Sequence, residues 1–170
     1  MILDNWLAQR AETCPDRVAL IAGGVELTYE ELEVEAARAA RRLAARGVRR
    51  GASVVVTQPA GVEYVIALHA LMKLGAVVHP LNPGLAPREL DAEIERANPA
   101  LVIGESDHVT MSEADLPLLG EHDLDALHCR ILTSGTSETP RSVGLTYGNH
   151  LWSAVGSAFN LGVDLSLIHI

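Results

Sequence analysis

Apolar residues in the first hundred positions follow two spacings in turn. Some recur every three or four residues, as in amphipathic helices, and others form short runs rich in β-branched side chains, as in buried strands. The helical spacing predicts helices at residues 3–11, 29–46, 62–74 and 88–97. The strand-like runs predict strands at residues 17–22, 25–28, 53–57, 76–79 and 100–103.

Turn and cap residues support several of these boundaries. The dipeptide Gly23-Gly24 separates two of the short strands and suits a tight hairpin turn. Thr28 and Glu31 form a capping-box pattern, in which the hydroxyl and the carboxylate satisfy N–H groups at the start of a helix. The most apolar window of the chain, residues 64–81, is interrupted by charged and polar residues and by a glycine. It therefore predicts a buried helix and strand, and no membrane span.

The alternation of strands with helices of ten or more residues predicts an α/β fold. Such βαβ units form a mostly parallel sheet flanked by helices. No Gly-x-Gly-x-x-Gly pattern occurs, so a dinucleotide-binding fold of the usual kind is not expected. Residues 104–128 are acidic and poorly periodic, and they predict a solvated connector. After Thr146, residues 149–160 return to helical spacing.

Composition narrows the function classes. The formal net charge of −9 argues against nucleic acid or an anionic membrane surface as a partner, because both favour a basic face. The first residues lack the basic-then-apolar order of a signal peptide, so a cytoplasmic location is expected. Cys14 and Cys129 are far apart and the histidines occur singly, which predicts reduced structural thiols and no metal-binding residues.

The segment from Ile131 to Val143 carries the clearest sequence pattern for ligand binding. Hydroxyl residues surround a single glycine, one arginine follows, and a strand at 143–146 comes next. Such a loop offers hydroxyls, backbone N–H groups and one cation to a polyanion such as a triphosphate. A Ser/Thr-rich surface turn is the alternative that composition leaves open. A Walker A loop is excluded, because its spacing is absent and a strand follows in place of a helix.

The order of these residues is more specific than their composition. Thr133-Ser-Gly-Thr-Ser-Glu-Thr-Pro-Arg141, followed by Gly144-Leu-Thr-Tyr-Gly-Asn-His150, resembles the phosphate-loop signature of the adenylate-forming superfamily. Residues 146–162 are most similar to the 2-succinylbenzoate–CoA ligases of menaquinone biosynthesis. Further similar segments are Asp16–Leu20, Leu27–Leu32, Gly75–Asn82 and Arg88–Leu90. The resemblance covers residue 1 to about residue 164.

The resemblance implies the N-terminal part of an adenylate-forming large domain and a two-step ligase reaction. A small-molecule carboxylate, here 2-succinylbenzoate, would attack the α-phosphate of ATP, and coenzyme A would then displace AMP. By the same resemblance, the residues that would contact the β- and γ-phosphates are Thr133, Ser134, Gly135, Thr136, Ser137, Thr139 and Arg141. Two positions depart from the family pattern: Glu138 stands where glycine is usual, and Arg141 where lysine is usual.

The resemblance also divides the chain. Residues 1–164 are expected to form a partial AMP-binding domain with its phosphate loop at 131–143, and residues 165–170 a non-native tail. No catalytic residue is assigned within the chain. The groups that contact magnesium and coenzyme A, and the C-terminal lid, are expected beyond its end, so the chain alone is expected to be inactive. Alternatives are another acyl- or aryl-CoA synthetase or adenylation domain, or a non-catalytic module of the same fold. Whether the protein forms a homo-oligomer is left open by the sequence.

Overall fold

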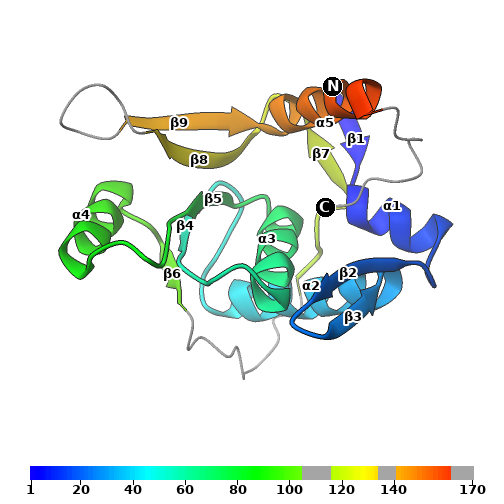
Figure 1. Cartoon of the computed structure of the whole chain (residues 1–170), viewed down its shortest axis with the longest axis horizontal. Helices are drawn as coiled ribbons and strands as arrows, with labels where there is room; N and C mark the ends of the chain where they lie inside the picture. Colours follow the sequence, from blue (N-terminus) through cyan, green and yellow to red (C-terminus); the bar gives the residue numbers. More distant parts are fainter. Residues whose placement is uncertain (105–115, 134–140, 162–170) are drawn as a thin grey trace.

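The computed structural model describes residues 1–104, 116–133 and 141–161. Its strands are β1 (Ile2–Asp4), β2 (Val18–Ala22), β3 (Val25–Thr28), β4 (Ser53–Val56), β5 (Val77–Pro80), β6 (Leu101–Ile103), β7 (Glu121–Asp123), β8 (Leu127–Thr133) and β9 (Arg141–Thr146). Its helices are α1 (Trp6–Thr13), α2 (Tyr29–Ala45), α3 (Val62–Leu74), α4 (Pro87–Ala97) and α5 (Tyr147–Leu161). Figure 1 shows their arrangement.

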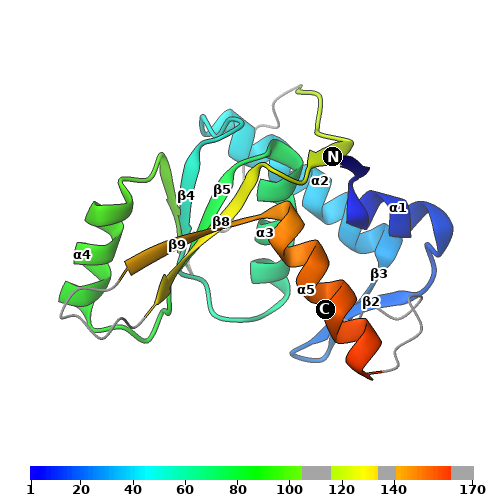
Figure 2. The ribbon, with the colours of Figure 1, turned by 90° about the horizontal axis from the view of Figure 1, so that it is seen from above.

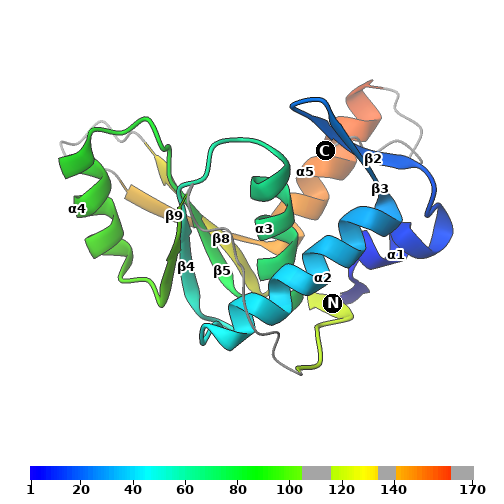
Figure 3. The same cartoon turned by 90° about the horizontal axis from the view of Figure 1, so that it is seen from below.

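The main sheet has the strand order β6–β4–β5–β8–β9 within the described residues. β4 is parallel to β5 and β6, and β5 is parallel to β8, whereas β9 returns antiparallel to β8. Helices α2 and α3 lie on one side of the sheet and α4 on the other (Figure 3). The predicted α/β fold with a mostly parallel sheet is therefore confirmed.

The main core lies between this sheet and the helix pair α2–α3. Val54 and Val56 of β4, Leu43 of α2 and Leu71 of α3 are almost fully buried in one cluster. Both faces of the sheet are covered at β4, which explains why the β4 sequence is apolar at successive positions without alternation. Among the helices of the described residues, none combines the length and the apolar character needed to cross a membrane.

The local signals seen in the sequence fix several element ends. Gly23 and Gly24 both have positive φ angles, 58° and 81°, and connect the antiparallel strands β2 and β3. The capping box at the start of α2 is present: the Glu31 backbone N–H donates to Thr28 Oγ1 at 3.2 Å, and the Thr28 N–H donates to Glu31 Oε2 at 2.8 Å. Gly75 ends α3 in the left-handed region with φ 63°.

The N-terminal prediction was wrong at its first residues. The segment Ile2–Asp4 is not helical; it forms β1, which pairs with β7 inside the segment predicted to be a connector. Asn5 then caps α1, its side chain accepting a hydrogen bond from the Ala8 N–H at 3.2 Å. Three-residue strands carry no readable periodicity, and the two partners are more than a hundred residues apart, so neither strand has a local signal.

Candidate functional site

The candidate phosphate loop connects β8 to β9 as a hairpin. Because β8 runs parallel to β5, its end at Thr133 lies on the sheet edge where ligands bind in open α/β sheets, the edge at the carboxyl ends of the strands. Thr133 pairs with Arg141 across the hairpin, and its hydroxyl donates to the Arg141 carbonyl at 3.1 Å. The strand expected after the loop is confirmed, and it begins at Arg141.

The structure describes two of the seven predicted phosphate-binding residues. Thr133 and Arg141 lie together at the base of the hairpin, and both are exposed. The other five, and the unusual glutamate between them, fall outside the described residues: Ser134, Gly135, Thr136, Ser137, Thr139 and Glu138. Their contacts with phosphate therefore stay predictions, supported by the position of the two hairpin ends.

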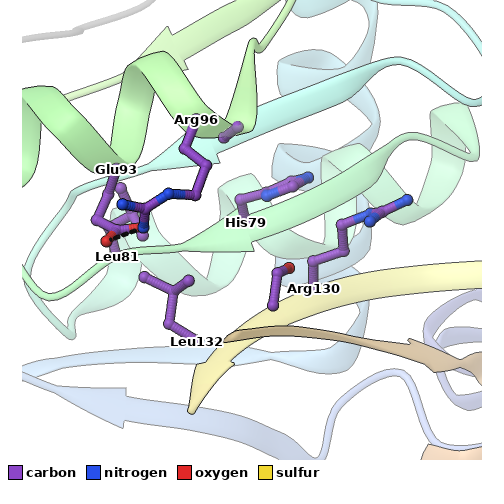
Figure 4. Close-up of a pocket in the computed structure, with 8 residues that line it drawn as sticks. His79, Leu81, Glu93, Arg96, Arg130 and Leu132 are labelled. Atoms are coloured by element: carbon purple, nitrogen blue, oxygen red, sulfur yellow. Dashed lines mark hydrogen bonds and ion pairs between the residues drawn. The ribbon is translucent and has the colours of Figure 1, made fainter. Parts of the chain in front are cut away.

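An open hollow borders the hairpin base on the α4 side of the sheet (Figure 4). It is lined by His79, Leu81, Glu93, Arg96, Ala97, Arg130, Leu132 and Ser142. Ser142 pairs with Leu132, one step along the hairpin from Thr133 and Arg141. Arg96 forms an ion pair with Glu93, which offsets the charge of the arginine. Burial and the nearby charge of Arg130 lower the pKa of His79. No local sequence pattern indicates this hollow, because its residues come from β5 and the residue after it, α4, β8 and β9.

Helix α5 begins directly after β9, earlier than the sequence predicted. The Asn149 N–H donates to Thr146 Oγ1 at 3.2 Å, and the Thr146 N–H donates to Asn149 Oδ1 at 2.9 Å, so both side chains cap the helix start. Figure 2 shows α5 extending away from the end of β9. Trp152 on this helix is 65% exposed, and Phe159 is 84% exposed.

An aromatic cluster lies under the first turn of α5. The His122 ring stacks on Tyr147 with centroids 4.4 Å apart, and Trp6 contacts both rings edge-on. The His128 ring lies 4.8 Å from Tyr147 and 4.7 Å from His150. Burial lowers the pKa values of His122 and His128 to about 4 and raises that of Tyr147 to about 12.

The structure changes the prediction that cysteines and histidines are scattered. His128, Cys129 and His150 offer ligand atoms that all lie within 4.8 Å of one another. The Cys129 sulfur is 3.3 Å from His150 Nε2, and burial raises the pKa of the thiol. Residue spacing missed this group because His150 comes from the following helix, 21 positions after Cys129.

We expect the folded protein to lose stability as the pH falls from about 6.5 to about 4, and His122 to cause part of the loss. Burial, followed by the charge of Lys73, lowers the pKa of His122 to about 4, whereas in the unfolded chain it titrates near 6.5. Between these values the unfolded state binds the extra proton, so acid favours unfolding, by up to about 3 kcal/mol for this one group. Urea unfolding of wild type and His122→Phe at pH 7, 5.5 and 4.5 checks this. Equal pH dependence in the two proteins would contradict it.

Comparisons with known proteins place the chain among adenylate-forming enzymes. The sequence profile of the AMP-binding enzyme family matches residues 7–169. The chain is 37% identical to the 2-succinylbenzoate–CoA ligase of Geobacillus kaustophilus over 95% of its own length and 36% of that protein. It is 34% identical to the enzyme of the same name from Bacillus subtilis, and the match covers 94% of this chain and 36% of that protein. The chain thus spans about a third of the length of these relatives.

Comparison with solved structures supports the same family. O-succinylbenzoate coenzyme A synthetase from Bacillus subtilis, in complex with ATP and magnesium ion, superposes with a TM-score of 0.90 at 30% identity, covering 96% of this chain and 49% of that one. The complex of the same enzyme with its acyl-adenylate intermediate gives a TM-score of 0.91, and the superposition covers 97% of this chain and 48% of that one. VinN, at 22% identity and a TM-score of 0.77, shares the fold. The resemblance inferred from the loop sequence is confirmed.

Proposed function

The chain belongs to the AMP-binding enzyme family, and from this premise we propose that it is the N-terminal part of a 2-succinylbenzoate–CoA ligase. The complete protein would activate 2-succinylbenzoate with ATP and transfer the acyl group to coenzyme A in the cytoplasm. The chain covers 36% of the Geobacillus kaustophilus relative, and we propose that the activity resides in a longer protein.

The observation that carries this proposal is the hairpin base. A phosphate loop needs two anchored ends at the carboxyl edge of the sheet, and β8 and β9 supply them. Thr133 closes the hairpin through its hydrogen bond to the Arg141 carbonyl, which fixes where the loop leaves and re-enters the sheet. The same hydrogen bond engages the Thr133 hydroxyl proton, so we assign Thr133 a positioning role.

Arg141 is the cation that this part of the chain offers to the departing phosphates. Its side chain is exposed at the first residue of β9, directly after the loop. A guanidinium can bind two phosphate oxygens at once, and it stays charged at any working pH. Phosphoryl and adenylyl transfer depend mainly on positioning and on neutralising charge, so an arginine here would stabilise the charge that develops on pyrophosphate.

The remaining donors follow from the sequence resemblance. Ser134, Gly135, Thr136, Ser137 and Thr139 would supply hydroxyl and backbone N–H groups to the β- and γ-phosphates. Magnesium would neutralise phosphate charge during adenylation, and coenzyme A would supply the thiol that receives the acyl group. No residue of this chain is assigned to either, and the acyl pocket is proposed to lie largely beyond residue 164. We propose that residues 165–170 form a non-native tail, although the family profile extends to residue 169.

The function is tested by ATP–pyrophosphate exchange. We expect the 170-residue chain to show no exchange above a boiled control, because most of the active site lies outside it. The protein encoded by the complete reading frame should exchange pyrophosphate with 2-succinylbenzoate, and not with benzoate or a medium-chain fatty acid. Exchange with one of the other acids would favour a different acyl- or aryl-CoA synthetase. No exchange with any acid would favour a non-catalytic module.

A further inference from the structure

A β-bulge brings two neighbouring residues of β8 to one site. Across the β8–β9 pair, Leu127 lies opposite Thr146 and Cys129 opposite Leu145, so His128 is an extra residue without a register partner. In a regular strand, His128 and Cys129 would point to opposite faces of the sheet. A bulge re-aims side chains locally, and here the ligand atoms of both residues lie close to the same partner, His150.

The spacing of the three ligand atoms suits a small metal ion. In a tetrahedral zinc site, metal–sulfur bonds of about 2.3 Å and metal–nitrogen bonds of about 2.0–2.1 Å place the ligand atoms about 3.5 Å apart. Cys129 Sγ and His150 Nε2 are already 3.3 Å apart. The ligand atoms all lie within 4.8 Å of one another, so reaching the spacing of a tetrahedral site requires a shift of about 1 Å.

The group also contains unused ligand capacity. Within the described part of the chain, neither His128 ring nitrogen has a hydrogen-bond partner, although both are buried. A buried polar atom without a partner destabilises the folded protein, and a metal–nitrogen bond would remove that cost for one of the two nitrogens. Cys129 is 5% exposed, but His150 is half-buried, which leaves an approach for an ion from the α5 side.

We propose that His128, Cys129 and His150 bind one zinc-class transition-metal ion, with water as the fourth ligand. Two imidazoles and one thiolate are the donor set that such ions prefer, whereas magnesium prefers oxygen ligands. Cys129 is four residues before Thr133, or about 13 Å along the strand, too far for this ion to contact phosphates held by the loop. The ion joins the start of α5 to β8 and stabilises the structure behind the hairpin.

This site is separate from the nucleotide-binding role and is tested without an activity assay. The 170-residue chain, treated with chelator, is titrated with Co²⁺ and then with Zn²⁺ under reducing conditions. We expect one equivalent of Co²⁺ to give the visible bands of a tetrahedral ion and a thiolate charge-transfer band, and Zn²⁺ to displace it. Bound Zn²⁺ should raise the Tm by several degrees, because it binds the folded state in preference.

Matched variants identify the ligands. His150→Gln and Cys129→Ser should each lower Zn²⁺ affinity by about 100-fold, since each removes one of three protein ligands. Cys14→Ser, which changes the other cysteine, should bind like wild type. His150→Gln is the safer variant for folding, because His150 is less buried than Cys129. Absence of a stoichiometric Co²⁺ spectrum in wild type, or an unchanged spectrum in His150→Gln, would overturn the proposal.

Discussion

Replacing Lys73 by methionine is expected to destabilise the folded chain by about 3–5 kcal/mol, because the change breaks a buried ion pair and leaves one charge behind. Lys73 lies in the last turn of α3, is 3% exposed, and pairs with Glu33 of α2. The Glu33 side chain is 24% exposed, and its second carboxylate oxygen is buried without a hydrogen-bond partner in the described structure. Partial solvent access to Glu33 places the expected loss at the lower end, about 3 kcal/mol.

The double variant Lys73→Met/Glu33→Leu tests whether the loss of stability comes from the unpaired charge or from the lost packing of the lysine side chain. If the cost comes from an unpaired buried charge, removing both charges should restore stability to within about 1 kcal/mol of wild type. Arg38 and Glu35 of α2 form an exposed pair that serves as the control, and Arg38→Met should cost less than about 1 kcal/mol. Urea unfolding at pH 7 gives all four values. A double variant as unstable as Lys73→Met would show that lysine packing, and not charge pairing, stabilises this position.

The elements with strong local signals could be predicted from the sequence. Helix α3 was predicted with its observed bounds, because an apolar run ends at a glycine that adopts positive φ. The β2–β3 hairpin and the start of α2 were also predicted, since Gly23-Gly24 and the capping box fix them locally. The parallel sheet followed from the alternation of strands and helices.

Long-range pairing could not be predicted in the same way. The β1–β7 pair joins two three-residue strands that are more than a hundred positions apart, and the Lys73–Glu33 pair joins residues forty positions apart. Neither leaves a periodic pattern. The bulge at His128 is also invisible in the sequence, because it depends on a one-residue register shift between β8 and β9. The candidate metal ligands therefore looked scattered, whereas the candidate phosphate loop is contiguous in sequence and could be proposed from it.

We expect Arg141→Ala to weaken ATP binding by the complete protein about 10- to 100-fold. Hydrogen bonds between a guanidinium and phosphate oxygens are worth about 1.5–3 kcal/mol, and about 1.4 kcal/mol corresponds to a tenfold change in affinity. The side chain is exposed at the end of the hairpin, and its backbone carbonyl is held by Thr133, so alanine should remove the charge without unfolding the strand. The apparent KM for ATP at saturating 2-succinylbenzoate measures the effect.

Two further variants define the role of the charge. Arg141→Lys keeps the cation but loses the two-point contact, so the KM for ATP should rise only a few-fold. Arg38→Ala removes an exposed arginine from α2 and should leave the KM for ATP unchanged. The KM for 2-succinylbenzoate should stay within about twofold of wild type in all three variants, because the loss is confined to phosphate binding. If Arg141→Ala leaves the KM for ATP unchanged, the hairpin base does not contact the nucleotide, and the proposed phosphate site is wrong.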